Sequence, residues 1–400
     1  MRKRALVLGN LPSVFVKDYI SKVLIPLGYK VDVKVDFATE KIRTESKIIA
    51  KELDIHLIEN HELKITKFVR LMQRKPALKK FGSLLLGILY KYYSFISRLK
   101  GNYDVVYVIN IHYEVLKHAL RYSTKNNIMA ATWIGSDILR RNDSELEKVW
   151  SVLEKFDVVT TLSSRLEKAF YERLLCDREY SFDVKKIYIG QVSFDYIDRL
   201  RNSSQLRQLK GQVIDDSKIV IGVGYNAGEA QQHKLVLQEL SKLDESIKKR
   251  IVIVLQMSYA DISGGKYTKE VIKLSVDGGF ETVVYDEFFY YDVVAQIRLF
   301  TDIYINSQTT DAFAGTIREY IYADTVLFNA SWLEYEEFGE WGIKSCVYNN
   351  FSELPNMIAN FDKEKEMAIA KKNREIITDK FSWERCKHEW AQTFERNMAQ

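Results

Sequence analysis

Residues 304–328, YINSQTTDAFAGTIREYIYADTVLF, contain in one stretch the pattern that decides the fold of this chain. An apolar run that ends at Asn306 indicates a strand, and a polar loop follows it. Gly315 then opens a segment of helical period, and a second apolar run begins at Thr325. Apolar strands that alternate with helices are typical of a parallel sheet covered on both faces.

The same alternation predicts strands in both halves of the 400-residue chain, which is long enough for two hydrophobic cores. The strands expected in the first half are residues 5–9, 30–35, 105–110, 128–133, 158–162 and 186–189. Those expected in the second half are residues 219–223, 251–256, 282–285, 303–306, 325–328 and 346–348. Residues 199–218 are polar without a strand candidate, which favours a domain boundary there. We therefore expect an N-terminal domain at 1–205, a C-terminal domain at 206–380 and a closing helix at 381–400.

The formal net charge of +5 is unevenly distributed along the chain. Residues 1–200 carry 35 basic and 24 acidic side chains, whereas residues 201–400 carry 24 basic and 30 acidic ones. Ten basic residues lie at 64–100, interleaved with apolar ones in an expected helical insertion at about 60–100. This insertion is suited to an anionic membrane surface, and a solvated helix face is the alternative. Because the C-terminal half is acidic, nucleic acid is not expected as a partner.

The sequence indicates neither export nor a resident metal. The apolar run at 81–89 is far shorter than the ~20 residues that a membrane-spanning helix needs. Cys176, Cys346 and Cys386 have neither metal-site nor redox spacing, and no two aspartates stand two residues apart as in an Asp-x-Asp metal motif. We expect a cytoplasmic protein that binds no metal and no other cofactor.

The second half opens with a strand, a glycine-containing turn and a helix, IVIGVGYNAGEAQQHKLVLQEL at 219–240. Glycine lets the backbone approach a diphosphate, and cationic side chains at a helix start can meet its oxygens. The candidates for this contact are Gly224, Tyr225, Asn226, His233 and Lys234. The stretch matches neither G-x-G-x-x-G nor the P-loop pattern, so a plain turn between strand and helix is the alternative.

Further candidates follow the next two strands, at the edge where open α/β sheets bind their ligands. They are Met257, Ser258 and Tyr259 after the strand at 251–256, and Glu287 after the strand at 282–285. Backbone groups and aromatic rings at such positions suit a nucleobase. The alternative is that the aromatic residues there belong to the core.

The loop and helix within 304–328 carry the remaining candidates of the second half. Glu319 lies one helical turn after Gly315, on the face below the free amides of the helix start. An acid in the loop, a glycine and a second acid can therefore bracket a sugar, a diphosphate and a ribose. The residues in question are Thr310, Asp311, Gly315, Thr316 and Glu319. The alternative is a capping Thr or Asp followed by a solvated Glu319.

This stretch resembles the donor-site motif of retaining transferases of the GT-B fold, especially the bacterial family 4 of capsular, O-antigen and exopolysaccharide enzymes. Their motif is an acid, seven residues and a glutamate, followed by a small-residue turn and an apolar strand. Asp311 and Glu319 enclose seven residues here, and the turn Tyr-Ala-Asp precedes the strand TVLFNAS. The chain departs from the motif by Asp311 in place of the first Glu and by Asp324 where the family usually has Gly.

The resemblance extends over most of the chain. ATWIGSDILRR at 131–141, VINIHYEVLKHAL at 108–120 and FDVVTTLSSRLEKAF at 156–170 are similar to elements of the N-terminal domain of these enzymes. FSWERCKHEW at 381–390 is similar to their closing helix. The turn GYNAGEAQQHK at 224–234 is also similar to the fucosamine transferases of enterobacterial common antigen, which invert.

The resemblance implies an α/β protein of the GT-B fold, with two Rossmann-like parallel-sheet domains that face a cleft and a C-terminal helix that crosses back to the N-domain. It implies a glycosyltransferase that moves a sugar from a nucleoside-diphosphate sugar to a glycan or lipid-linked acceptor in cell-surface glycan synthesis. It further implies retention. The missing Asp-x-Asp pair favours metal independence, and the basic residues at 64–100 suit a place at the inner face of the cell membrane. An inverting transferase, a GT-B epimerase or phosphorylase, and a non-catalytic nucleotide-sugar binding protein remain as alternatives.

Carried over to this sequence, the resemblance implies that Asp311 contacts the transferred sugar and that Glu319 binds the ribose. The amides of Gly315 and Thr316 would hold the diphosphate, and Lys234 would neutralise the charge of the leaving group.

In the N-terminal half, the resemblance implies that His112 or Asp137 orients the acceptor or the sugar. Both have a structural alternative. Asp137 can instead cap the helix that follows it, and His112 can belong to the core.

Overall fold

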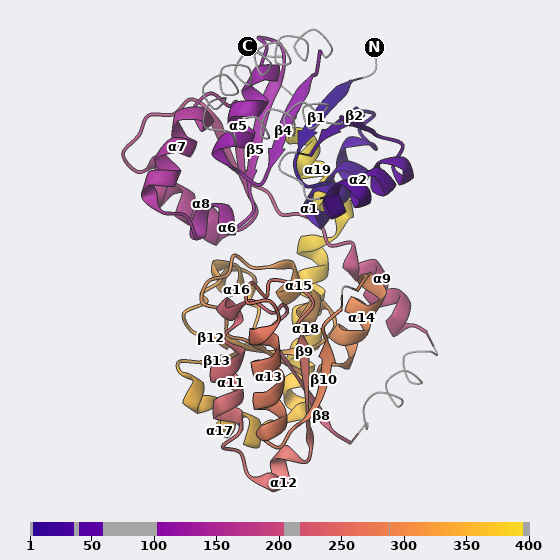
Figure 1. Ribbon diagram of the computed structural model, residues 1–400, viewed down its shortest axis with the longest axis vertical. Coiled ribbons are helices and arrows are strands. Elements are labelled where there is room, and N and C mark those ends of the chain that lie inside the picture. Colours follow the sequence, from indigo (N-terminus) through magenta and orange to yellow (C-terminus); the bar gives the residue numbers. More distant parts are fainter. Residues whose placement is uncertain (1–2, 36–39, 59–101, 204–216, 288, 395–400) are drawn as a thin grey trace, which may run out of the picture. The chain divides into compact units, whose positions relative to one another are not determined.

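The computed structural model describes residues 3–35, 40–58, 102–203, 217–287 and 289–394, so the basic stretch at 64–100 lies outside the described residues. The chain forms two α/β units (Figure 1). Unit 1 comprises Met1–Leu162, Leu166–Ile189 and Cys386–Gln400, and unit 2 comprises Ser163–Arg165 and Gly190–Arg385.

Unit 1 contains a seven-stranded parallel sheet in the order β3-β2-β1-β4-β5-β6-β7. Its strands are β1 (Arg4–Leu8), β2 (Lys30–Lys34), β3 (His56–Ile58), β4 (Val105–Ile109), β5 (Ile128–Trp133), β6 (Val158–Thr161) and β7 (Asp183–Lys186). The chain leaves β1 toward β2 and leaves β4 toward β5, so the strand order reverses between β1 and β4. This reversal is where doubly wound sheets bind their ligands.

The helices of unit 1 cover both sides of this sheet, with α1 and α2 on one side and α5 and α7 on the other (Figure 1). They are α1 (Val14–Tyr19) with a π turn at Ile20–Leu24, α2 (Glu40–Glu52), α5 (Tyr113–Ala119) with a 3-10 turn at Leu120–Tyr122, α6 (Ser136–Leu139), α7 (Asp143–Leu153) and α8 (Ser164–Phe170) with a π turn at Tyr171–Leu175. The central strands β4 and β5 are buried along their whole length, because helices pack on both of their faces.

Unit 2 repeats the architecture with a six-stranded parallel sheet in the order β10-β9-β8-β11-β12-β13. Its strands are β8 (Ile219–Val223), β9 (Ile251–Gln256), β10 (Glu281–Tyr285), β11 (Ile303–Asn306), β12 (Val326–Ala330) and β13 (Cys346–Tyr348). The order reverses between β8 and β11. The two parallel sheets confirm the predicted pair of Rossmann-like domains.

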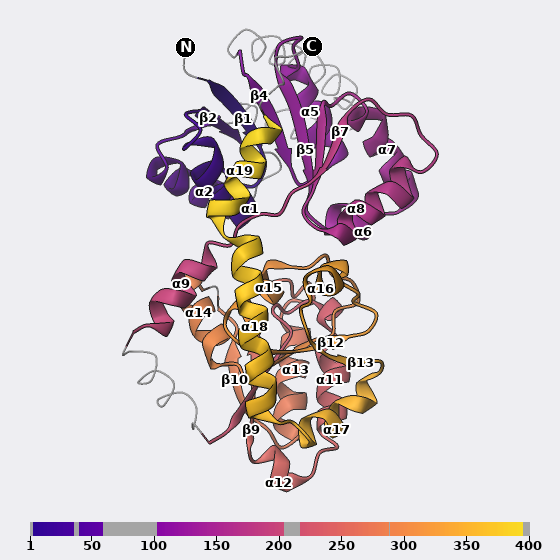
Figure 2. The ribbon, with the colours of Figure 1, turned by 180° about the vertical axis from the view of Figure 1, so that it is seen from behind.

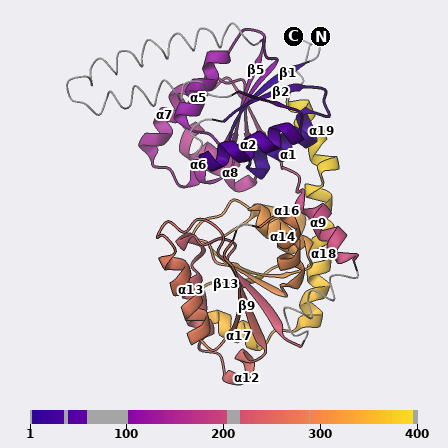
Figure 3. The ribbon, with the colours of Figure 1, turned by 45° about the vertical axis from the view of Figure 1, so that its right-hand side comes forward.

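The helices of unit 2 also cover both faces of their sheet, with α13 and α18 on opposite sides (Figure 3). They are α9 (Ser193–Arg201), α11 (His233–Leu240), α12 (Glu245–Lys248), α13 (Lys266–Asp277), α14 (Tyr291–Phe300), α15 (Gly315–Tyr322), α16 (Glu336–Trp341), α17 (Leu354–Ala359) and α18 (Lys363–Phe381). The side chain of Asp362 caps the start of α18 by accepting a hydrogen bond from the amide of Lys365.

The last helix, α19 (Trp383–Thr393), returns the chain to unit 1, where it lies beside α1 (Figures 1 and 2). Trp390 is fully buried, its ring centroid is 4.9 Å from that of Tyr19, and its indole N–H donates to the carbonyl of Tyr188 at 3.0 Å. The apolar anchors read from the tail therefore mark a helix that completes the core of the N-terminal unit, and the predicted crossing is confirmed.

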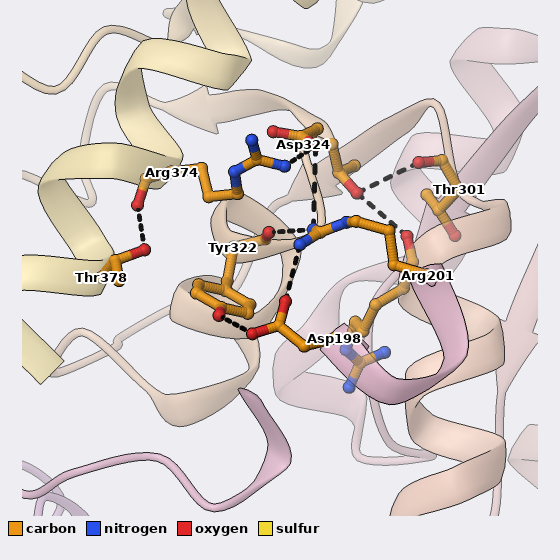
Figure 4. A network of polar contacts seen from close by, with 9 residues as sticks. Asp198, Arg201, Thr301, Tyr322, Asp324, Arg374 and Thr378 are labelled. Carbon is orange, nitrogen blue, oxygen red and sulfur yellow. Dashed lines mark hydrogen bonds and ion pairs between the residues drawn. The ribbon is translucent and has the colours of Figure 1, made fainter. Parts of the chain in front are cut away.

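The main segment of unit 2 starts at Gly190, whereas the sequence indicated a boundary at 205/206. Phe194 of α9 stacks on Tyr322 of α15 with ring centroids 3.8 Å apart. Asp198 accepts a hydrogen bond from the Tyr322 hydroxyl, and Arg201 donates to the Tyr322 carbonyl (Figure 4). These contacts make α9 part of the second unit, although it precedes the polar stretch at 199–218.

Candidate functional site

The turn after β8 is shaped around a buried histidine. Gly224 has a φ of +66°, and a Cβ at this position would lie 2.3 Å from the Nε2 atom of His233. Glycine is thus required both by the backbone conformation and by the contact. Desolvation lowers the pKa of His233 to about 3, so the ring is neutral at pH 7. His233 therefore does not supply the cation at the helix start that the sequence suggested.

Lys234, the second candidate cation, lies against α13. Its ammonium group forms an ion pair with Glu270 and lies 4.9 Å from the centroid of the Tyr267 ring. The charge of Lys234 is therefore balanced within unit 2, which leaves backbone amides as the main candidates for anion contact.

A backbone hydrogen bond joins the loops that follow β8 and β9, at the C-terminal ends of these strands. The amide of Ala227 donates to the carbonyl of Tyr259 at 2.8 Å, and the amide of Gly228 donates to the Asn226 side chain at 2.8 Å. Tyr259 is 54% exposed, yet its hydroxyl end lies among Asn226, Arg298 and Glu319, and desolvation there raises the pKa of the phenol. Its ring is thus available to a ligand while its hydroxyl is held.

The neighbouring candidates have different surroundings. Met257 is buried and its amide donates to the carbonyl of Tyr285 at 2.7 Å, so its side chain belongs to the core. Ser258 is half-buried in the same loop. Glu287 is exposed after β10, which is the edge strand, two strands away from β8.

Asp311 organises the loop between β11 and α15. Its Oδ2 atom accepts from the amide of Ala314 at 2.9 Å and from the hydroxyl of Tyr335 at 2.7 Å, and its Oδ1 atom accepts from Gln308 at 3.1 Å. Gln308 in turn accepts from the Tyr225 hydroxyl at 3.3 Å. With only 6% exposure, Asp311 links this loop to the glycine turn, and direct contact with a sugar stays a prediction.

The start of α15 presents free backbone donors. The N–H groups of Gly315 and Thr316 have no hydrogen-bond acceptor among the described residues, as expected for the first turn of a helix. Both residues and the preceding Thr310 are half-buried. An α-helix N-terminus of this kind attracts a phosphate or diphosphate.

Glu319, one turn into α15, is held by an arginine that the sequence analysis missed. Arg298 of α14 is 3% exposed, and its Nε and Nη2 atoms contact the Oε2 atom of Glu319 at 3.1 and 3.0 Å. The Nη1 atom of Arg298 donates to Gln256 at the end of β9 at 2.6 Å. The Oε1 atom of Glu319 has no hydrogen-bond donor among the described residues, so one carboxylate oxygen remains for a ligand.

A pocket of about 590 Å³ opens in unit 1 where the strand order reverses. Its residues lie at the end of β4, follow β1 or β4, or belong to α5, α7 and the loop before α7. They are Gly9, Asn10, Ile109, Asn110, His112, Tyr113, Glu114, Val115, Arg141, Glu145 and Lys148. The pocket contains His112 and lies at the place that the topology assigns to a ligand.

Asp137 does not line this pocket but binds the backbone of the loops next to it. The buried carboxylate accepts from the amides of Ile111, Ile134 and Gly135 at 2.8–3.2 Å. Burial raises the pKa of Asp137 to about 6, although the three amides oppose the rise. Asp137 therefore ties the loop after β4 to the loop after β5, and its role in orienting a substrate stays a prediction.

The structure thus brings the second-half candidates together in unit 2 around the ends of β8, β9 and β11, apart from Glu287. His112 and Asp137 lie in unit 1. Among the described residues, no group of three or more His, Cys, Asp or Glu side chains is arranged to hold a metal ion. No helix within the described ranges is both long and apolar enough to span a membrane.

No known family model matches the chain. No curated protein matches it either. Solved structures do match, over nearly the whole chain. The glycosyltransferase from Rickettsia africae ESF-5 superposes with a TM-score of 0.66 and 17% identity, covering 98% of each chain. The chain has the GT-B fold.

Two further structures agree. Anabaena Alr3699/HepE, solved in complex with UDP-glucose, has a TM-score of 0.68 and 16% identity over 98% of each chain. The sucrose-phosphate synthase of Thermosynechococcus elongatus has a TM-score of 0.67 and 13% identity over 98% of each chain.

Proposed function

We propose that this protein is a glycosyltransferase that takes its sugar from a nucleoside-diphosphate sugar bound to unit 2. The observation that supports it best is the group of ligand-ready atoms at the reversal between β8 and β11. Free amides at Gly315 and Thr316 and a free oxygen on Glu319 lie within one helical turn of each other. The similar fold of a glycosyltransferase and of HepE, a protein crystallised with UDP and with UDP-glucose, supports the same conclusion.

Each part of the donor has a matching group in unit 2. A carboxylate accepts hydrogen bonds and donates none, so Glu319 suits the ribose hydroxyls. The amides at the start of α15 suit the diphosphate, whose negative charge grows as the glycosidic bond breaks. The exposed ring of Tyr259 offers a face for the base.

We further propose retention and metal independence for the reaction, with a glycan or lipid-linked acceptor in cell-surface polysaccharide synthesis. The proposal of retention and of the acceptor rests on the likeness of the Asp311–Glu319 stretch to the family 4 motif. Contact with an anionic membrane through residues 64–100 rests on their charge.

Donor binding is testable by isothermal titration with UDP, GDP and ADP, followed by the sugar conjugates of the nucleotide that binds. Glu319→Gln keeps the size of the side chain and removes its charge. We expect 10- to 100-fold weaker nucleotide binding, because a hydrogen bond to a charged group contributes about 1.5–3 kcal/mol. Glu281→Gln is the matched control, since Glu281 is also ion-paired, with Lys218, but lies on the edge strand β10.

Transfer itself is read as nucleoside diphosphate release from the conjugate that binds. We expect release to rise when glycan or lipid-linked acceptors are added. The proposed function is wrong if no nucleotide binds, or if Glu319→Gln and Glu281→Gln bind the nucleotide equally well.

A further inference from the structure

In the unit 1 pocket, Arg141 determines which ring nitrogen of His112 carries the hydrogen. The Nη2 atom of Arg141 lies 2.6 Å from the Nδ1 atom of His112. A guanidinium has only donors and does not lose its proton in proteins, so Nδ1 must be the acceptor. The neutral ring then carries its hydrogen on Nε2, which has no partner among the described residues.

Hydrogen bonds from other elements hold the backbone beside both members of this pair. Asp137 accepts from the amide of Ile111, next to His112, at 2.9 Å. Arg173 donates to the carbonyl of Arg141 at 2.7 Å and to the carbonyl of Ile138 at 2.5 Å. The contact therefore belongs to the fixed framework of the pocket, although His112 itself is exposed.

Two acidic and two basic residues line the pocket together with His112. Glu114 belongs to α5, Glu145 and Lys148 belong to α7, and Arg141 precedes α7. Desolvation and then the charge of Arg141 lower the pKa of His112, whereas Glu145 raises it, and the net shift is downward. The ring is thus neutral around pH 7.

Asn110 adds an unused acceptor to the same pocket. It follows β4 with a φ of +73°, in the left-handed region, and its Oδ1 atom is buried without a hydrogen-bond partner among the described residues. A ligand that fills this pocket therefore has to offer a donor to Asn110 and an acceptor to His112. A hydroxyl group is both, and sugars carry several of them.

We propose that Arg141 is a positioning residue that fixes His112 as the Nε2–H tautomer, so that the pocket offers a hydrogen-bond donor, and no base, to a polyhydroxylated ligand. The ligand class rests on the proposed glycosyltransferase function, in which such a ligand is an acceptor or donor sugar. The tautomer of His112 does not depend on the proposed function, because Arg141 fixes this tautomer in the protein without a ligand.

The tautomer is measured by ¹⁵N NMR of histidine-labelled protein without any ligand. The His112→Asn variant identifies the signals of His112 among those of the six histidines. We expect the neutral ring of the wild type to be in the Nε2–H form. Arg141→Gln should populate both tautomers and bring the pKa of His112 toward the ordinary ~6.5. Arg141→Lys, which also only donates, should restore the tautomer.

Arg140→Gln is the control, because Arg140 is the exposed neighbour of Arg141 in the same loop. It should leave the signals of His112 unchanged. An Nδ1–H form in the wild type, or a wild type and an Arg141→Gln variant with the same tautomer and pKa, would overturn the role of Arg141.

The ligand class is tested with free glucose, galactose and N-acetylglucosamine at tens of millimolar, read at the same His112 signal. We expect at least one sugar to shift it, and the shift to be lost in Asn110→Gly, which keeps the left-handed backbone and removes only the amide. If no sugar shifts the signal, or the shift survives in Asn110→Gly, the pocket does not bind hydroxyl groups as proposed. Donor binding in unit 2 is measured separately, so failure here and failure of the proposed function are distinguishable.

Discussion

Asp324 is held in a backbone conformation that costs energy for most residues, which makes its replacement informative. It follows α15 with a φ of +66°, at the position where the related motif usually has glycine. Its Oδ2 atom lies 2.6 Å from Nη1 of Arg374 and 3.7 Å from Nη2 of Arg201 (Figure 4). Any replacement thus changes a backbone contribution and a charge contribution at once.

The charge contribution is small. Burial raises the pKa of Asp324 even though Arg374 and Arg201 lower it, so the ionised carboxylate is less favourable here than in water. Arg374 is 31% exposed and can be solvated, and Arg201 keeps its bonds to Asp198 and to the Tyr322 carbonyl. We assign the loss of the pairs about 0–1 kcal/mol.

The backbone contribution decides the order of the variants. Left-handed backbone costs a residue with a Cβ about 1–2 kcal/mol, which glycine avoids and which Asp and Asn partly avoid. We expect Asp324→Gly to stay within about 1 kcal/mol of the wild type. Asp324→Ala should be about 1–2 kcal/mol less stable than Asp324→Gly, because both variants lose the same ion pairs.

Thermal unfolding followed by circular dichroism measures this difference, which corresponds to about 2–8 °C for a domain of this size. Lys372, exposed in the interior of α18, is the control: there Ala should be more stable than Gly by about 1 kcal/mol. If Asp324→Ala were as stable as Asp324→Gly while Lys372 showed the usual order, the positive φ would not carry the cost assigned to it.

Three further predictions concern buried groups of the two units. The pKa of His233 is about 3 in the folded protein and 6.5 in its ordinary state. Below pH 6.5 the unfolded chain therefore binds a proton at His233 that the folded chain does not bind, and the free energy of unfolding falls. Between pH 7.5 and 5 we expect urea titrations to show a loss of about 2 kcal/mol that is absent in His233→Asn. Gly224→Ala should cost about 2–5 kcal/mol, since its Cβ meets the His233 ring at positive φ, whereas Gly339→Ala, with no atom within 4 Å, should cost nothing. Asp137→Asn sets an NH₂ group against backbone amides and should cost about 1–3 kcal/mol in the same assay, with equal stability to the wild type as the contradicting result.

The sheets could be predicted from the sequence because their central strands are buried on both faces. Strands β5, β8 and β9 have the bounds that the apolar runs indicated. The two edge strands of the unit 1 sheet could not be predicted in the same way. β3 is a three-residue strand that is exposed or half-buried, and β7 consists of DVKK, ahead of the apolar run expected at 186–189. Edge strands are covered on fewer sides, so their sequences carry less of the apolar signal.

The candidate site could be predicted only where its chemistry lies in the backbone. A free amide at the start of α15 follows from the helix itself, and the glycine at Gly224 follows from its turn. Whether a side chain is free depends on which elements the fold brings beside it. Glu270 of α13 pairs with Lys234, and Arg298 of α14 pairs with Glu319. The spacing of residues in the sequence predicts neither ion pair.

Arg298 shows how such a pairing changes the meaning of a motif. An acid at the second position of the motif looks solvated in sequence, yet here a buried arginine holds one of its oxygens and also contacts the end of β9. An arginine left without that acid would be a buried, unpaired charge, which costs several kcal/mol. Glu319 therefore serves the core of unit 2 as well as a ligand, and its replacement has to be judged by nucleotide affinity and by stability together. A loss of affinity at unchanged melting temperature would assign the free oxygen to the ligand, whereas a matched loss of both would assign Glu319 to the fold.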